Sequence, residues 1–171
     1  RDLAGPGPTL DQQREMVAIA ARTPDHGKLA PWRFVIVPDE RRDALADLLE
    51  RAYRAEKPDA GRLEIEAMHQ FARQAPAVIV VLSSPKQSKI PLWEQELSVG
   101  AAAMNLLHAA HAMGFAGGWL TGWPCYNETV RDAFGTTDEK IAGFVFIGTP
   151  SRALEERPRP ELGDVLSVWE G

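Results

Sequence analysis

Four side chains that can carry charge or move protons stand together in one short turn. Arg22, Asp25, His26 and Lys28 lie within seven residues, between an apolar helical pattern and an apolar strand pattern. An arginine makes forked, charge-assisted hydrogen bonds to phosphate, and a histidine ring can donate or accept. The residues leave two interpretations open: a polar surface turn, or a contact site for an anionic or heterocyclic ligand.

A glycine-rich stretch forms the second candidate. The segment Gly114-Phe-Ala-Gly-Gly-Trp119 has the wrong spacing for a dinucleotide fingerprint, and it leaves a helix rather than opening one. One interpretation is a helix stop followed by a tight entry into a sheet. The other is a backbone wall without side chains, against which a flat ring could lie.

The remaining reactive side chains do not form a recognisable catalytic set. His108 and His111 are three residues apart, but no third ligand stands at metal-site spacing. Cys125 has no base beside it, so a nucleophilic role is weakly supported. We therefore expect neither a metal nor a catalytic side chain. Arg157 and Arg159 are either a solvated charge run or residues that return to close a phosphate site.

Composition narrows the class of protein. The 171 residues carry a formal net charge of −5, which argues against nucleic-acid and anionic-membrane partners because both require a basic face. The single cysteine excludes an internal disulfide and favours a reducing compartment, so we expect a cytoplasmic protein. No apolar run is long enough for a transmembrane helix. The chain begins with Arg1 rather than Met, and we expect native sequence before it.

The elements that must position these residues follow from periodicity and capping signals. Thr9 and Gln12 have capping-box spacing, Pro24 ends the first helix, and Asp39 is placed to cap the second. Asn127 can cap a later helix that Gly135 ends. We expect helices near residues 10–21, 39–56, 62–73, 91–113 and 128–134, and strands near 34–37, 77–82, 115–122 and 141–148. The prediction is one α+β domain over residues 1–171, a mixed sheet flanked by helices.

Two segments predict self-association. The long helix expected at 91–113 is small and apolar on nearly every side, which is typical of a central or interface helix. The C-terminal stretch is rich in proline and charge, yet it ends in Leu166, Val168 and Trp169 with no element of its own to bury them. An arm that docks on a second subunit would explain these residues, so we expect a homodimer.

Three motifs, in this order, resemble the nitroreductase family of flavoproteins, and most closely its small members. They are Arg22-Thr-Pro-Asp-His-Gly-Lys-Leu-Ala-Pro-Trp-Arg-Phe-Val, then Trp93-Glu-Gln-Glu-Leu-Ser-Val-Gly-Ala-Ala-Ala-Met-Asn-Leu-Leu running into Gly114–Trp119, and Lys140-Ile-Ala-Gly-Phe-Val-Phe-Ile-Gly-Thr-Pro150. The resemblance implies an α+β fold in an intertwined homodimer, with FMN at the subunit interface and NAD(P)H as its reductant.

The resemblance also assigns roles to individual residues. The positions that match FMN contacts are Arg22, His26, Trp119, Leu120 and Thr121, with Arg159 and Arg157 matching C-terminal phosphate contacts. A segment associated with NAD(P)H corresponds to Ala109, Ala110, His111, Ala112, Met113 and Gly114.

The chain departs from the family pattern in two places. Many members have Ser and Asn at the positions of Asp25 and Lys28, and Gln at Ala30, which implies different polar contacts to the flavin. The family opens with an Arg-Arg-Ser-x-Arg phosphate motif, of which Arg1 corresponds to the last residue. We expect Arg1 to contact the FMN phosphate.

The function implied is an FMN-dependent oxidoreductase that uses NAD(P)H to reduce nitroaromatic or quinone-type acceptors by a ping-pong mechanism. Because a flavin carries hydride chemistry at its N5 atom, no acid, base or nucleophile is required of the protein. Two alternatives stay open: other flavin chemistry on the same fold, such as dehalogenation or ene reduction, and a non-catalytic dimer that binds FMN or another ligand without turnover. The residues decide neither the acceptor nor the choice between NADH and NADPH.

Overall fold

Five strands form one sheet whose described pairs are all antiparallel. The computed structural model describes residues 3–153 and 155–171. The strand order is β1-β5-β3-β2, and β4 also pairs with β5. The strands are β1 (Leu3–Ala4), β2 (Trp32–Val37), β3 (Ala77–Ser83), β4 (Ala116–Leu120) and β5 (Lys140–Pro150).

Helices cover the sheet and end close to the predicted positions. The Thr9–Gln12 capping box and the Asn127 cap are confirmed. The cap predicted at Asp39 is wrong, because Asp39 begins a 3₁₀ turn. No described helix combines the length and apolar composition needed to span a membrane. The helices are α1 (Leu10–Ala20), α2 (Arg42–Glu56), α3 (Arg62–Arg73), α4 (Leu92–Ala112), α5 (Trp123–Tyr126), α6 (Glu128–Phe134) and α7 (Leu162–Val165), with 3₁₀ turns at His26–Lys28 and Asp39–Arg41.

The α+β class with a long helix is confirmed, but the mixed sheet is not. β3 and β4 run in the same direction because the single helix α4 joins them, and adjacent strands of this kind would form a parallel pair. Instead β5 lies between them and pairs antiparallel with each. The local pattern predicted β2 to β5 but not the two-residue strand β1. The order of the strands is set by contacts between distant segments.

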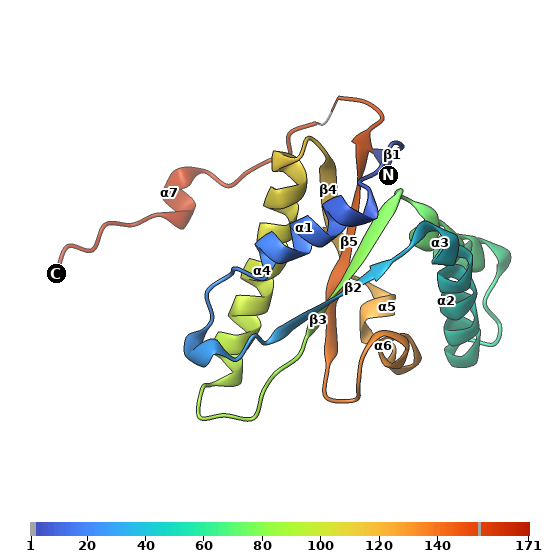
Figure 1. Cartoon of the computed structure of the whole chain (residues 1–171), viewed down its shortest axis with the longest axis horizontal. Coiled ribbons are helices and arrows are strands. Elements are labelled where there is room, and N and C mark those ends of the chain that lie inside the picture. The colour runs from blue at the N-terminus through green and yellow to red at the C-terminus, as the bar shows by residue number, and fades with distance from the viewer. Residues whose placement is uncertain (1–2, 154) are drawn as a thin grey trace.

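Strand β3 separates two apolar cores. Its residues are completely buried, and alternate side chains point to opposite faces of the sheet. Val78, Val80 and Leu82 pack with α2 and α3, whereas Ile79 and Val81 pack with α1 and α4. Figure 1 shows these two pairs of helices on opposite sides of the sheet. The strand predicted near residues 77–82 is therefore confirmed, and it is buried on both faces of the sheet.

Strand β5 carries a bulge that holds a tryptophan of β4. Val81 of β3 pairs with Gly143 of β5, and Leu82 pairs with Ile141, so Ala142 between them has no partner in β3. A bulge re-aims the local backbone, and the Ala142 carbonyl accepts a hydrogen bond from Trp119 Nε1 at 3.0 Å. Gly143 leaves room for the ring, because a Cβ there would lie 2.0 Å from Trp119 Nε1. The bulge and the glycine together fix where the indole stands.

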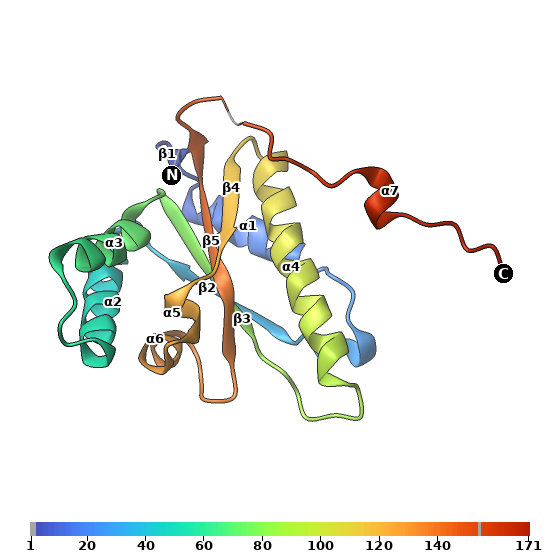
Figure 2. The same ribbon diagram turned by 180° about the vertical axis from the view of Figure 1, so that it is seen from behind.

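The C-terminal arm, residues 155–171, leaves the body of the molecule. All of its residues are exposed, and Figure 2 shows the arm extending away from the sheet beyond α4. Val168 is 82% exposed and Trp169 91% exposed. The arm therefore presents large apolar side chains that this chain alone does not bury, as the sequence predicted.

Candidate functional site

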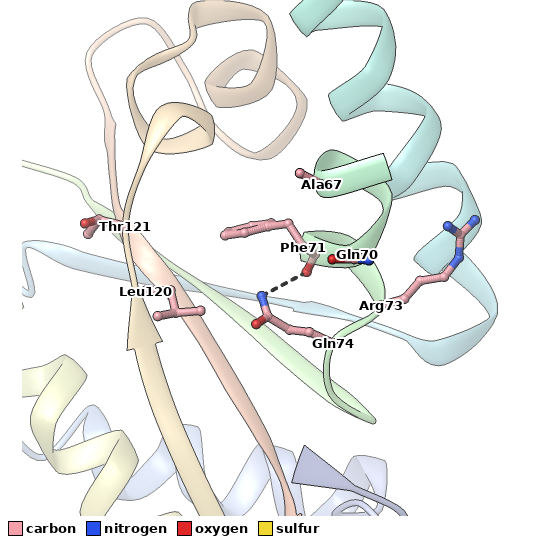
Figure 3. A pocket seen from close by; sticks show the side chains of 7 residues that line it. All are labelled: Ala67, Gln70, Phe71, Arg73, Gln74, Leu120 and Thr121. Carbon is pink, nitrogen blue, oxygen red and sulfur yellow. Dashed lines mark hydrogen bonds between the residues drawn. The ribbon is translucent and has the colours of Figure 1, made fainter. Parts of the chain in front are cut away.

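A cleft of about 650 Å³ lies between α3 and the end of β4. Figure 3 shows its two walls: side chains of the last two turns of α3 on one side, and Leu120 and Thr121 on the other. The lining residues are Ala67, Gln70, Phe71, Arg73, Gln74, Leu120 and Thr121. Two of the three strand residues assigned to FMN by resemblance thus line one cleft.

Strand β4 reaches the cleft through Leu120, and two glycines without side chains, Gly117 and Gly118, precede the lining residues. Side chains alternate along a strand, so Gly118 and Leu120 share one face, while Gly117 and Trp119 share the other. On the α4 side a Cβ at Gly117 would lie 2.7 Å from Leu107. On the cleft side a Cβ at Gly118 would meet nothing within 4 Å. A flat ligand can therefore approach the strand backbone closely at Gly118.

The α3 wall carries amide groups, and its one charged side chain is held away. Figure 3 shows Gln74 extending toward Leu120 and Arg73 pointing away from the strand. Gln74 Nε2 donates to the Phe71 carbonyl at 3.2 Å. Arg73 donates from Nε and Nη2 to Asp43 Oδ1 of α2, at 2.9 and 2.7 Å. The cleft is therefore lined by neutral polar groups and apolar side chains. The guanidinium of Arg73 is paired with Asp43.

The charged turn after α1 packs on α4, and none of its residues line the cleft. The Ser98 hydroxyl donates to the Pro24 carbonyl at 2.8 Å, and Asn105 Nδ2 donates to the Thr23 hydroxyl at 2.7 Å. These bonds leave Arg22 exposed beyond the helix end. A single chain therefore does not unite Arg22 and the cleft in one pocket.

His26 also lies on the α4 side, where its ring pairs with an acid. Its Nδ1 is 2.6 Å from Glu94 Oε2 of α4, and both side chains are partly exposed. Gly27, the residue after His26, adopts a positive φ of 81° and turns the chain before it enters β2. The exposed His26 ring stays accessible to a ligand.

Trp119 stands apart from its two strand neighbours. Its indole lies on the α4 face of β4, 4.0 Å from where a Cβ at Gly100 would be. Leu120 and Thr121 instead line the α3 cleft. The three residues were assigned to one flavin contact, and strand alternation divides their side chains between two faces. Trp119 can meet a ligand in the cleft only through its backbone.

The segment assigned to NAD(P)H is the last turn of α4 and its end. Ala109 and Ala110 are 3% and 0% exposed and belong to the core, so their side chains are closed to a ligand in this chain. His111, Ala112 and Gly114 are exposed and Met113 is half-buried.

The arginines assigned to phosphate lie at the two chain ends. Arg157 and Arg159 are exposed in the arm, and Arg159 Nε is 2.6 Å from Glu156 Oε1. Arg1 lies outside the described residues. Strand β1, near the N-terminus, pairs with Thr149 and Pro150 at the end of β5. The described part of the N-terminal segment therefore lies beside the point where the C-terminal segment begins.

The α3 wall was missed by sequence reasoning. Gln70 lies within the helix predicted near residues 62–73, and Gln74 directly follows it. Polar residues on the outer face of such a helix ordinarily face solvent. Nothing in the spacing of Gln70 and Gln74 distinguishes an amide that lines a cleft from one that is solvated. The position of β4 against α3 supplies that information.

Other reactive groups do not form a second catalytic centre. Burial raises the pKa of the Cys125 thiol to about 11, so little thiolate forms near neutral pH. Cys125 lines a separate cavity of about 260 Å³. His108 and His111 are exposed on α4. Within residues 3–153 and 155–171, no three His, Cys, Asp or Glu side chains gather as a metal site.

Comparison with known proteins assigns the chain to a family. A family model described as "Nitroreductase family" matches residues 2–149. A protein of Escherichia coli (strain K12), "Putative NAD(P)H nitroreductase YdjA", is 36% identical over 150 residues, covering 86% of this chain and 81% of that protein.

Two solved structures share the fold. A nitroreductase-like family protein from Bacillus cereus has a TM-score of 0.82 at 23% identity, covering 100% of this chain and 90% of that chain. The FMN-dependent nitroreductase NfnB from Mycobacterium smegmatis in complex with NADPH has a TM-score of 0.76 at 18% identity, covering 99% and 93%. The family model and the E. coli relative both span most of the chain, and the chain therefore belongs to the nitroreductase family.

Proposed function

We propose that this protein is an FMN-dependent oxidoreductase that uses NAD(P)H to reduce nitroaromatic or quinone-type acceptors by a ping-pong mechanism, in the cytoplasm. Family membership and the name of the E. coli relative support this class. The observation that carries the proposal is the cleft between the end of β4 and α3, which is lined by Leu120, Thr121, Gln70 and Gln74 and lies next to the open backbone at Gly118.

The residues of the cleft fit a flavin ring. Its volume of about 650 Å³ lies within the usual range for cofactor pockets. Gly118 leaves a gap that a side chain would otherwise fill, and a planar tricyclic ring requires such an approach. Phe71 and Leu120 offer apolar contact, while Thr121, Gln70 and Gln74 offer hydrogen bonds to the polar ring edge.

The protein's contribution to catalysis would be binding, orientation and exclusion of water. FMN, when bound, supplies the hydride and electron chemistry at N5. The β4 backbone from Gly118 to Thr121 would cover one ring face and leave the other open to nicotinamide and then to the acceptor. Using one open face for both substrates requires the oxidised nucleotide to leave first, which is a ping-pong sequence.

Two copies of the chain would complete the site. The turn with Arg22 and His26 lies on α4, away from the cleft of its own chain. α4 also exposes an apolar stripe at helical spacing: Trp93, Leu97 and Met104 are 67%, 53% and 43% exposed. We propose that this stripe and the C-terminal arm pair two subunits, so that the turn of one copy reaches the cleft of the other.

Flavin bleaching tests the proposed function. Protein loaded with FMN and desalted should lose its visible flavin absorbance when NADH or NADPH is added without oxygen. After removal of the nucleotide, a nitroaromatic or quinone should restore the absorbance, because the two half-reactions are separable. The measurement is anaerobic absorbance spectroscopy. Bound FMN that neither nucleotide bleaches would overturn the oxidoreductase and leave a non-catalytic binding protein.

Sedimentation tests the dimer and its part in FMN binding. The unmodified chain of 18.8 kDa should sediment with about twice that mass. Leu97→Asp puts a charge into the proposed interface and should yield a folded monomer whose FMN affinity falls at least tenfold, because one copy then lacks the partner's turn. Leu63→Asp is the matched control, since Leu63 is a 71% exposed leucine of α3 outside the stripe. A monomeric unmodified protein at micromolar concentration would contradict the dimer.

A further inference from the structure

Gln74 occupies a position in the cleft that no sequence motif assigned. We infer that its neutral amide positions the pyrimidine edge of FMN and sets the electrostatics of that edge, an inference that rests on the proposed function. Gln74 directly follows α3 and is half-buried. Its amide lies on the strand side of the helix and faces Leu120. A ring seated on β4 would therefore present one edge to this amide.

The amide retains hydrogen-bonding capacity for a ligand. Nε2 donates to the Phe71 carbonyl at 3.2 Å, at the long end of the normal range. A carboxamide has two N–H donors and a carbonyl acceptor, so this bond leaves one donor and the acceptor. The pyrimidine edge of a flavin presents a carbonyl, an N–H and a second carbonyl in a row. One amide can pair with a neighbouring carbonyl and N–H of that edge.

The same geometry directs the guanidinium of the neighbouring Arg73 away from Gln74. Among the described residues that line the cleft, Arg73 is the charged one, and its two bonds to Asp43 direct it toward α2. Reduced FMN carries negative charge on its pyrimidine ring, and a nearby cation stabilises that form. Gln74 recognises the ring in both redox states without favouring the reduced one. The protein would therefore hold FMN without raising its reduction potential through this contact.

Charge variants at Gln74 test the inference through the flavin potential. Gln74→Lys should bind reduced FMN about tenfold more tightly relative to oxidised FMN, which raises the two-electron potential by about 30 mV. Gln74→Glu should shift the potential by a similar amount in the opposite direction. Gln74→Leu keeps the site uncharged and should weaken oxidised FMN binding about tenfold through loss of the amide pair. Spectroelectrochemistry measures the potentials, and fluorescence titration measures affinity.

The controls separate this contact from general effects of charge or folding. Thr137 is exposed in the turn before β5, so Thr137→Lys and Thr137→Glu make the same charge changes outside the cleft and should leave the potential unmoved. Thermal unfolding shows whether each variant is folded. Shifts of opposite sign in Gln74→Lys and Gln74→Glu, absent in the Thr137 pair, support the inference.

Two outcomes overturn different claims. If unmodified protein binds FMN and NAD(P)H bleaches it, but the Gln74 variants leave potential and affinity unchanged or shift both potentials in one direction, the role of Gln74 is overturned and the proposed function stands. If unmodified protein retains no FMN, the proposed function and this inference fail together.

Discussion

Replacing Gly143 by alanine is expected to lower the free energy of unfolding by about 3 kcal/mol. The new Cβ would lie 2.0 Å from Trp119 Nε1 and 2.4 Å from its Cδ1, so the indole must leave its place. The loss combines overpacking, which typically costs about 1–3 kcal/mol, with the Trp119–Ala142 hydrogen bond, worth about 1 kcal/mol. Urea unfolding measures the change.

A double-mutant cycle identifies the clash as the cause. In a Trp119→Ala background there is no indole to displace, so Gly143→Ala should cost less than in the unmodified protein. The cost that remains comes from the φ of 159° at Gly143 and from the Leu120 carbonyl oxygen, which lies 3.1 Å from the new Cβ. Gly118→Ala is the matched control on the neighbouring strand, because its Cβ meets nothing within 4 Å and stability should hardly change. If Gly143→Ala lowers the free energy of unfolding equally with and without the Trp119 side chain, the clash with the indole is not the cause of the loss.

Replacing Arg33 by methionine should remove about 2–3 kcal/mol of stability at neutral pH. Arg33 donates from Nε and Nη2 to the Glu139 carboxylate, at 3.0 Å each. Glu139 is 6% exposed, and these bonds hold the pKa of its carboxyl near 2, against an ordinary 4.5. The variant leaves a buried carboxylate whose remaining hydrogen-bond donors, the Thr136 N–H at 2.9 Å and the Ser84 side chain, are uncharged.

The pH dependence of this effect has a defined sign. Because the folded-state pKa of Glu139 is depressed, its stabilising contribution is fully present above about pH 4.5 and is lost as the pH falls toward 2. The difference between unmodified protein and Arg33→Met should shrink over that window in urea unfolding. Arg14→Met is the control, since the Arg14–Asp11 pair is 66% and 91% exposed and is worth less than about 1 kcal/mol. A difference that does not vary between pH 7 and pH 3 would contradict the assignment to Glu139.

Local signals in the sequence predicted most of the fold. The Thr9–Gln12 box, the Asn127 cap and the stop at Gly114 act within a few residues, and each is found where the sequence placed it. Asp39 shows the limit of such signals. It has the residue type of a cap, but the chain makes a 3₁₀ turn first, and α2 starts at Arg42 without a side-chain cap.

The parts of the candidate site that the sequence did not predict depend on distant segments. Gln74 lines the cleft because β4, more than forty positions later in the chain, ends beside it. Trp119 and Leu120 are neighbours in one motif, yet the pleat of the strand sends them to opposite faces. The bulge at Ala142 arises from pairing with β3 and has no local marker except the adjacent Gly143. Resemblance singled out Leu120 and Thr121, which line the cleft, but it carried no information about the wall opposite them.

The central position of β5 has a consequence for synthesis of the chain. β3 needs β5 beside it, yet β5 begins at Lys140 and β3 ends at Ser83. At usual translation rates, the ribosome would take on the order of 3–10 s to add the intervening residues. During that time Val78–Leu82, a run of high strand propensity, stands with one edge unpaired, which is the condition that favours aggregation. The nascent chain is therefore most vulnerable between the emergence of β3 and that of β5, and chaperones that bind apolar segments would act in this interval.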